Sequence, residues 1–499
     1  MTNKPDDKQL DLGSSAFTGA AFMVATRFAV RLLGLISVTV LARLLTPEDF
    51  GLFGTAALTL GFFILLKEMG FSEAVIRDPD LRKEDIDTLW TMRLILSIIT
   101  ALAVYFTAPF AADFLKDTRV TAVLQVMALL PIIDGLGSPA SPLLLKDLKF
   151  ATDFLLKSAN KIVQVTAVIT VAFILKSYWA LVFGALLSSV FGVVITHIAR
   201  PYKPHISLSM LRKHQSFAVW TYIKSISFYF ANSSDEFVVR SAASTGFFGI
   251  YHIARDLARV LIGDLIGPVR EAMLPALSKM QNEPERLAVA VSNIFGATLI
   301  VAVALSFGIA MTASELVLLL LGDQWGGAAH FLSLLAIGCA CNSIGEVNQS
   351  GFVAAGMQHK SALFWTLRAG IYGTGCIIAG LLYGPEAIAL TFSLLSVIAL
   401  VFETRFLFNK LGVKTSMVSL AFRPLFAGGL MAATLHFLPL SNDWPLPAVL
   451  FTKIAAGGLV YGGLILILWK LVQFKEGPEH TLYSNLPQKL RKLVPLQIQ

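Results

Sequence analysis

Two pairs of arginines stand at helical spacing inside long apolar segments of this chain of 499 residues. Arg27 and Arg31 are four positions apart, and so are Arg255 and Arg259. Residues at this spacing lie on one face of a helix, where two like charges repel each other. An anion held between the guanidinium groups would relieve the repulsion through charge-assisted hydrogen bonds. The pattern therefore predicts a cationic site for an anionic ligand.

Further polar side chains interrupt other apolar segments. Lys161 forms a short stripe with Asn160 and Gln164, and Lys224 and Asp235 fall on one helical face. Charges are costly in hydrocarbon and by default mark a pathway or a buried partner. The candidate substrate-binding residues of a cationic cavity are Arg27, Arg31, Lys161, Lys224, Arg255, Arg259 and Arg368. The candidate polar or ion-coupling residues are Asp134, Asp235, Asn342, Glu346 and Gln349. The alternative is a structural role, as an ion-pair partner or as a side chain that reaches the lipid headgroups.

The sequence contains no motif for catalysis or cofactor binding. Its cysteines, Cys339, Cys341 and Cys376, fall in apolar segments without a His or carboxylate cluster at ligand spacing, which favours small buried residues over a metal site. Phosphate-binding glycine loops, dinucleotide fingerprints and nucleophile elbows do not occur in the sequence. We therefore expect no enzyme activity, no catalytic residue, no metal and no cofactor.

The elements that would position these residues are membrane-spanning helices. The chain is 56% hydrophobic and 14% charged, with a mean hydropathy of +0.71, which no soluble domain of this size would tolerate. Apolar runs long enough to cross about 30 Å of hydrocarbon recur along the sequence. We predict an all-α integral membrane protein with fourteen spans, near residues 17–42, 51–70, 88–110, 120–144, 155–175, 178–198, 216–239, 246–273, 288–311, 325–354, 361–383, 386–408, 416–438 and 447–471.

The distribution of Lys and Arg among the loops predicts the orientation, because these residues concentrate in cytoplasmic loops. Loop 199–214 is basic, whereas 312–324 and 439–446 hold no Lys or Arg. We expect both termini in the cytoplasm, and the net charge of +8 reports this bias rather than nucleic-acid binding. The predicted parts are a cytoplasmic segment at 1–16, a six-helix lobe at 17–198, a basic cytoplasmic linker at 199–215, a second six-helix lobe at 216–408, two peripheral helices at 409–473 and a basic cytoplasmic tail at 474–499.

A weak internal repeat supports the two lobes. Phe50-Gly51 returns as Phe248-Gly249, 198 residues downstream, and an offset of 197 places Arg43 on Arg240. Six spans separate the copies, so both lobes would enter the membrane in the same orientation. We expect the lobes to be related by a pseudo-twofold axis along the membrane normal, with the cavity between them.

The first copy of the repeat also carries a family resemblance. Leu45, Pro47, Phe50 and Gly51 match a Leu-x-Pro-x-x-Phe-Gly pattern, and residues 70–76 continue the likeness. The stretch resembles the start of bacterial polysaccharide transporters, the Wzx-like flippases of the multidrug/oligosaccharidyl-lipid/polysaccharide exporter superfamily. Within them it looks most similar to exopolysaccharide exporters of the colanic acid, succinoglycan and xanthan type. The likeness covers the whole chain in span number and in the repeat.

This resemblance implies a substrate, a mechanism and partners. The substrate would be an oligosaccharide repeat unit joined through diphosphate to a polyprenol, which alternating access would move across the bacterial inner membrane for exopolysaccharide or lipopolysaccharide synthesis. A diphosphate needs fixed cations to leave water, because burying it unpaired is prohibitive. The implied partners are this lipid-linked substrate, membrane lipid, and a polymerase and chain-length regulator of the same pathway. Coupling to a proton or sodium gradient stays open.

Two other functions are left as alternatives. A drug/cation antiporter of the same superfamily would have fewer spans and an acid-dominated cavity, whereas cations dominate here. A membrane glycan polymerase or ligase would need a long outer loop with catalytic Arg or His, and the predicted outer loops are short.

Overall fold

The fold is known from a computed structural model that describes residues 29–65, 82–139, 143–146, 150–209, 211–439, 443–471 and 477–480. All regular elements in these ranges are helices, and no strand occurs in them. The chain divides into two compact units, Met1–Gly249 and Ile250–Gln499. The protein is therefore all-α, as the sequence predicts, and each unit is described by itself.

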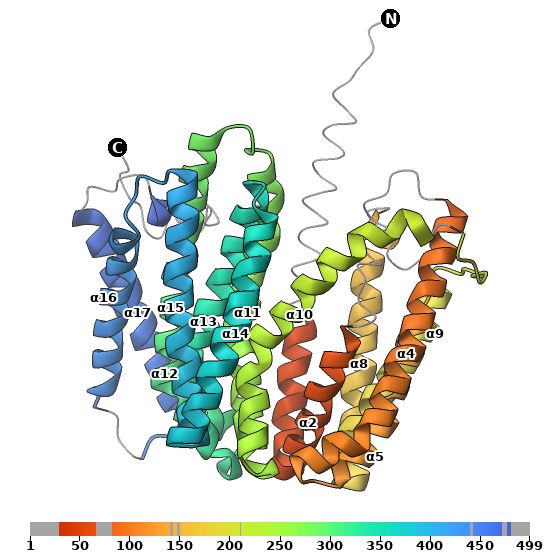
Figure 1. The fold of residues 1–499 in the computed structure, drawn as a ribbon. Helices are drawn as coiled ribbons and strands as arrows, with labels where there is room; N and C mark the ends of the chain where they lie inside the picture. Colours follow the sequence, from red (N-terminus) through yellow and green to blue (C-terminus); the bar gives the residue numbers. More distant parts are fainter. Residues whose placement is uncertain are drawn as a thin grey trace, which may run out of the picture. The chain divides into compact units, whose positions relative to one another are not determined.

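The first unit is a bundle of long helices (Figure 1). Its core buries apolar side chains of five helices, among them Leu52, Val104, Val123 and Val182. The most extensive helix contact in this unit joins α8 to α9, and α4 packs against α5 and α6. The helices of this unit are a helix over residues 29–44, α2 (Pro47–Ile64), α4 (Lys83–Leu115), α5 (Arg119–Met127), α6 (Leu129–Gly135), α7 (Leu143–Lys146), α8 (Phe150–Leu175), α9 (Trp179–Ala199) and α10 (Leu211–Ala242).

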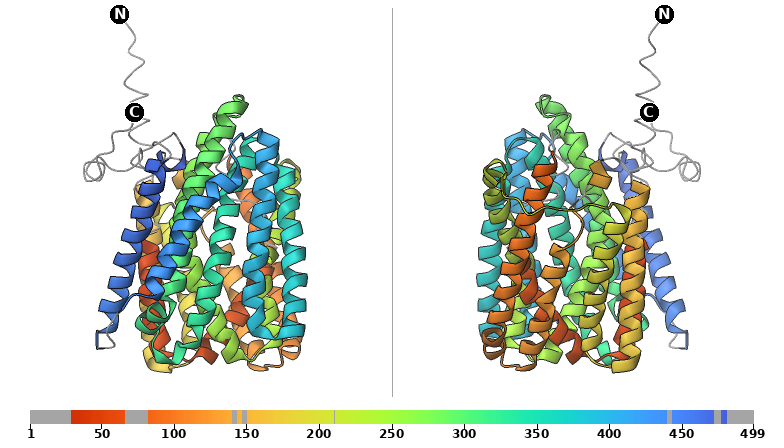
Figure 2. Two further views of the ribbon diagram at one scale, coloured as in Figure 1. Left: turned by 90° about the vertical axis from the view of Figure 1, so that its left-hand side faces the viewer. Right: turned by 90° about the vertical axis from the view of Figure 1, so that its right-hand side faces the viewer.

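The second unit is also a helical bundle, and α11 (Thr245–Ser278) enters it after its first turn. Within the unit α13 packs against α12 and α15, and α14 packs against α15. The last two helices, α16 and α17, pack against each other and against α12, and Figure 2 shows them side by side. The remaining helices are α12 (Pro284–Leu320), a short 3-10 turn at Asp323–Trp325, α13 (Gly327–Ala354), α14 (Gln358–Tyr383), α15 (Pro385–Leu411), α16 (Met417–His436) and α17 (Leu446–Leu471).

The helices coincide with the apolar segments of the sequence. Nine of those in the described ranges are long and apolar enough to cross a membrane, namely α4, α8, α9, α12, α13, α14, α15, α16 and α17. The chain is therefore a multi-pass membrane protein. Polar and charged residues interrupt α10 and α11, the two helices that carry several of the candidate site residues. The count of fourteen spans, the orientation and the division into lobes stay predictions.

The fourth predicted span, 120–144, is not one continuous helix. Here α5 ends at Met127 and α6 runs only from Leu129 to Gly135. Pro131 explains the break, because a proline ring clashes with the carbonyl four residues earlier, which is that of Met127. The same residue fits the first turn of α6, where no intrahelical N–H bond is needed. Hydropathy alone does not register this interruption.

The start of α2 is fixed by its local sequence. The Thr46 hydroxyl accepts a hydrogen bond from the Asp49 backbone N–H at 3.3 Å, and the Asp49 carboxylate accepts from the Thr46 backbone N–H at 2.9 Å. This reciprocal capping box, with Pro47 at the first helical position, satisfies helix N–H groups that have no partner inside the helix. The other Asp49 oxygen accepts from the Tyr178 backbone N–H at 2.9 Å, so the cap also holds the turn before α9.

The glycines of the two repeat copies meet in the first unit. A Cβ on Gly51 would lie 1.9 Å from the carbonyl oxygen of Thr245, and a Cβ on Gly249 would lie 1.8 Å from that of Pro47. Only a residue without a Cβ allows this approach. The first turns of α2 and α11 therefore pack backbone to backbone, and this contact places the two turns beside each other.

Candidate functional site

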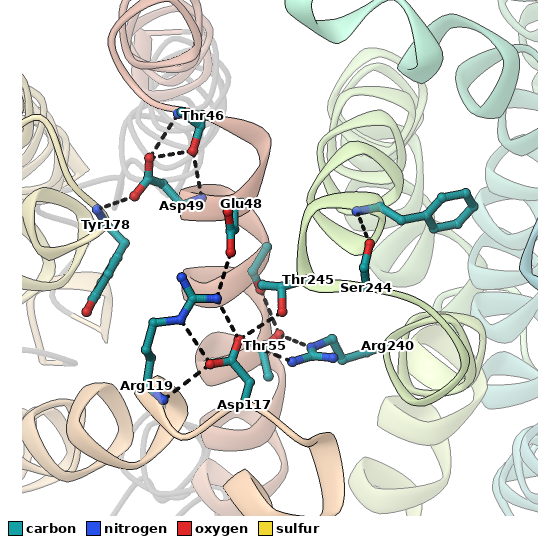
Figure 3. Close-up of polar contacts among 12 residues, drawn as sticks. Thr46, Glu48, Asp49, Thr55, Asp117, Arg119, Tyr178, Arg240, Ser244 and Thr245 are labelled. Carbon is teal, nitrogen blue, oxygen red and sulfur yellow. Dashed lines mark hydrogen bonds and ion pairs between the residues drawn. The ribbon is translucent and has the colours of Figure 1, made fainter.

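Charged and hydroxyl side chains from three turns gather at one end of the first unit (Figure 3). Glu48 stands in the first turn of α2, Asp117 lies between α4 and α5, Arg119 begins α5, and Arg240 and Thr245 flank the turn between α10 and α11. We call these five residues the turn cluster. Residues separated by up to about 200 positions come together here because α2 begins, and α4 and α10 end, on the same side of the bundle.

Asp117 is the centre of the turn cluster. Arg119 donates to it from Nε and from one terminal nitrogen, both at 3.0 Å, in the two-pronged geometry that guanidinium and carboxylate groups favour. The Thr245 hydroxyl donates to the same carboxylate at 2.9 Å. Arg119 also reaches Glu48 at 2.8 Å, so one arginine joins the α2 end to the turn between α4 and α5.

Arg240 is a buried member of the turn cluster, with only 4% of its side chain exposed. Its Nε donates to the Thr55 hydroxyl at 2.7 Å, and that hydroxyl donates in turn to the Gly51 carbonyl at 2.7 Å. One terminal nitrogen of Arg240 lies 3.8 Å from Asp117 and makes no hydrogen bond with the described residues. The buried guanidinium is therefore compensated mainly by the charge of Asp117.

The electrostatic balance keeps the cluster ionised. Burial by itself would raise the pKa of Asp117, but hydrogen bonds from Arg119 and Thr245, with the charge of Arg119, outweigh it and hold that pKa below its ordinary value. Hydrogen bonds to Asp117 and Glu48 raise the pKa of Arg119 above its ordinary value. Opposite charges at hydrogen-bond distance favour the charged form of both partners.

An open cavity of about 770 Å³ lies against the turn cluster. It is lined by Glu48, by residues 114–119 and by residues 240–246, all of the first unit. Its charged lining residues are the basic Lys116, Arg119 and Arg240 and the acidic Glu48 and Asp117. The size lies within the range of ligand sites.

None of the turn-cluster residues belongs to the sequence-predicted site. Arg240 draws attention in the sequence only as the repeat partner of Arg43, and the other charged members stand next to span ends, where charges are ordinary. The contact between Asp117 and Arg240 spans 123 positions and depends on how α4 and α10 pack. A charge directly beside a capping Thr-Pro pair, as at Glu48, is the one local signal that could have pointed here.

The candidate residues of the first unit occupy different environments. Arg31 is exposed, and Asp134 is exposed at the end of α6. Lys161 is half-buried, donates to Gln164 at 2.9 Å and lies in ordinary contact distance of the helix position of Gly34. Asp235 is completely buried in α10. Arg27 and the side chain of Lys224 lie outside the described residues.

Arg255 and Arg259 share a helix but not an environment. Arg255 is buried, with its guanidinium carbon 4.0 Å from the centre of the Phe392 ring and one nitrogen 3.3 Å from the Cys339 sulfur. Arg259 is exposed and pairs with Asp256 at 2.6 Å, one turn earlier in α11. The boundary between the buried and exposed faces of α11 runs between the two arginines.

Arg368 is engaged deep in the second unit. It pairs with Glu403 of α15 at 3.0 Å, and each side chain is only 3% exposed. Trp365 lies under the guanidinium at 4.9 Å, and a Cβ on Gly345 would come within 2.7 Å of one of its nitrogens. Glu403 is therefore a buried charge that the sequence did not single out.

Three of the candidate polar residues lie on α13 and differ in their surroundings. Asn342 is buried and accepts a hydrogen bond from the Tyr372 hydroxyl of α14 at 3.3 Å. Glu346 and Gln349 are half-buried on the same helix. Among the described residues no group of three or more His, Cys, Asp or Glu side chains is arranged to hold a metal ion.

Comparison with solved structures identifies the fold. The chain superposes on "Lipid II flippase MurJ, inward closed conformation" with a TM-score of 0.72 and 15% identity, over 91% of this chain and 99% of that one. It is also similar to an inward-facing multidrug resistance MATE family transporter of the MOP superfamily, with a TM-score of 0.58 and 15% identity, over 79% of this chain and 100% of that one. The chain therefore has the fold of these membrane transporters.

Sequence relatives cover most of the chain. "Lipopolysaccharide biosynthesis protein WzxC" of Escherichia coli (strain K12) is 22% identical over 397 residues, which is 78% of this chain and 80% of the relative. "Succinoglycan biosynthesis transport protein ExoT" of Rhizobium meliloti (strain 1021) is 22% identical over 443 residues, 87% of this chain and 89% of the relative. The model of the family described as "Polysaccharide biosynthesis protein" matches residues 40–330, more than half of the sequence. The helical fold agrees with this match, and the chain belongs to the polysaccharide biosynthesis protein family.

Proposed function

We propose that this protein is a flippase that moves a polyprenyl-diphosphate-linked oligosaccharide across the bacterial inner membrane. The observation that carries the proposal is the family match joined to a transporter fold over 91% of the chain, in a fold whose compared member is named a lipid II flippase. The relatives named for lipopolysaccharide and succinoglycan synthesis support a glycan as the headgroup. No catalytic step is assigned to the chain.

The candidate cations fall into two groups that would serve the flippase differently. Arg31, Lys161 and Arg259 keep at least part of their side chains accessible, and we propose that they bind the diphosphate. Arg guanidinium groups suit this task because their planar fork matches phosphate oxygens. Arg255 and Arg368 are buried against ring systems and, for Arg368, a carboxylate, so we assign them to holding helices in register.

The remaining parts of the proposal follow from the charge bias of the loops. Both termini lie in the cytoplasm, and the substrate site faces the two sides of the membrane in turn, as in alternating access. Asp134, Asp235, Asn342, Glu346 and Gln349 are candidates for ion coupling. A polymerase and a chain-length regulator of the same pathway are the proposed partners.

The proposal is tested by export in cells that depend on this protein. Arg31→Ala and Arg259→Ala should reduce surface polysaccharide and cause lipid-linked oligosaccharide to accumulate on the cytoplasmic leaflet. Lysine at either position should restore only part of the export, because it keeps the charge and loses the fork. Arg286→Ala is the matched control, since Arg286 is exposed and paired with Glu283 at the start of α12. Normal export by the Arg31→Ala/Arg259→Ala double variant at normal protein level would refute the diphosphate-binding assignment.

A further inference from the structure

The cavity beside the turn cluster is lined by Lys116, a cation that has no counterion among the residues that the structure describes. Lys116 is exposed, and its side chain makes no hydrogen bond or ion pair with the described residues. Its backbone closes α4 in a left-handed conformation, with φ of 53°, and the residue lines the cavity. The two carboxylates of the lining are already paired, Asp117 with Arg119 and Arg240, and Glu48 with Arg119. The unbalanced charge of the cavity is therefore positive.

A strip of aromatic side chains leads to the same cavity along α4. Phe106, Phe110 and Phe114 follow one another at four-residue spacing and are 66%, 75% and 75% exposed. This spacing places the three rings on one face of the helix. In a membrane-spanning helix an exposed apolar face contacts lipid, and Phe114, the last ring of the strip, also lines the cavity. A polar cavity thus opens at the end of a lipid-contacting face.

From this juxtaposition we propose that the cavity binds the phosphate headgroup of a lipid whose tail lies along the aromatic strip. Lys116 would provide the unpaired charge, Arg119 is half-exposed and would share its fork with the phosphate, and hydroxyl groups such as that of Ser244 border the space. A lipid reaches such a site without leaving the bilayer, and its tail packs against the aromatic strip. A soluble anion has no apolar part that would pack there. The volume of about 770 Å³ exceeds that of one phosphate and leaves room for attached groups.

The proposal rests on the proposed function in one respect, namely which lipid occupies the site. The orientation proposed above places the turn between α4 and α5 on the periplasmic side. There the cavity receives the diphosphate headgroup of the flipped product before it leaves the protein. An anionic phospholipid of the outer leaflet has the same phosphate chemistry, and the experiment below separates the two sources.

The chain offers a matched pair of lysines for the test. Lys116 and Lys176 both close long helices of the first unit in a left-handed conformation, with φ of 53° and 46°, and both are exposed. Lys176 does not line the cavity. Replacing either one with alanine removes the same charge from the same kind of backbone position, and only Lys116→Ala removes it from the cavity.

Lipid retention is measured by native mass spectrometry on the full-length protein in phosphatidylcholine nanodiscs. The probes are a polyprenyl diphosphate in one arm and phosphatidylglycerol in the other. The Arg31→Ala/Arg259→Ala background reduces binding at the proposed transport site. In that background we expect Lys116→Ala to weaken retention of one probe by about tenfold, the loss typical of one charge-assisted hydrogen bond. Lys176→Ala should leave retention unchanged, and Lys116→Arg should preserve it.

The outcomes separate this proposal from the proposed function. Loss confined to the diphosphate arm identifies the flipped product as the occupant, and loss confined to the phosphatidylglycerol arm identifies an outer-leaflet phospholipid. Equal retention of both probes by Lys116→Ala and Lys176→Ala overturns the headgroup site, even where Arg31 and Arg259 prove necessary for export. Normal export by the Arg31→Ala/Arg259→Ala protein, with retention still dependent on Lys116, overturns the proposed transport site and leaves the headgroup site standing.

Discussion

At the scale of single residues, Asp117 is the central member of the turn cluster. It holds Arg119 by two hydrogen bonds and is the ion-pair partner of the buried Arg240. Asp117→Asn keeps the shape and removes the charge, so it should destabilise the protein by about 1–3 kcal/mol. A thermal unfolding scan in detergent measures this as a lower Tm. Asp113→Asn changes an exposed carboxylate one turn earlier and should leave Tm unchanged.

The Asp117 carboxylate predicts that the stability of the folded protein depends on pH. Because its pKa in the folded protein is held below the ordinary value of 3.8, Asp117 contributes stability above that pH and loses it as the pH falls through the folded-state pKa. The difference in Tm between wild type and Asp117→Asn should therefore be constant near neutral pH and shrink at pH values below 3.8. A difference that grows on acidification would mean that another group dominates.

The Arg368–Glu403 pair makes a second prediction at this scale. Removing one member of a buried pair leaves an uncompensated charge and costs about 3–5 kcal/mol, whereas replacing both with apolar groups is often tolerated. Arg368→Met and Glu403→Leu should each lower the amount of folded protein in the membrane, and the double variant should recover much of it. Should Arg368→Met be stable and defective only in export, Arg368 would return to the substrate-binding group.

At the scale of elements, the contact between the first turns of α2 and α11 explains the repeated Phe-Gly pair. A methyl group on Gly51 or Gly249 would enter the van der Waals space of a backbone carbonyl on the other helix turn. Gly51→Ala and Gly249→Ala should each destabilise the protein by about 1–3 kcal/mol or more, since backbone must move. Gly246→Ala is the control, because nothing lies within 4 Å of its Cβ position. Equal Tm values for the three variants would contradict the contact.

At the scale of the whole molecule, the testable expectation is topology. A reporter fused at Lys203 should read cytoplasmic and one at Asp443 periplasmic, because Lys and Arg concentrate in the loops predicted to be inside. A cysteine placed at Lys116 should react with a membrane-impermeant thiol reagent added from the periplasmic side. Protection of that cysteine in intact cells, with labelling only after lysis, would invert the orientation and move the proposed headgroup site to the cytoplasmic leaflet.

The sequence alone determines the class of this protein and its helices. Hydropathy is a sum over neighbouring residues, so the helical class and the membrane class follow from local composition. Even so, a window average of hydropathy does not register the interruption before Pro131, because it takes no account of the clash between the proline ring and the carbonyl of Met127. The family resemblance also lies in the sequence, in Leu45, Pro47, Phe50 and Gly51, and the family match confirms it.

Only the tertiary structure decides which charges share an environment. Helical spacing predicts that Arg255 and Arg259 act together, but the neighbours of α11 bury one against Phe392 and leave the other exposed. The packing of the helices pairs Asp117 with Arg240 and Arg368 with Glu403. The spacing of residues within one helix does not determine which other helix lies against it. The sequence shows directly which residues are charged. The counterion of each charge depends on contacts between distant segments, and those contacts exist only once the chain has folded.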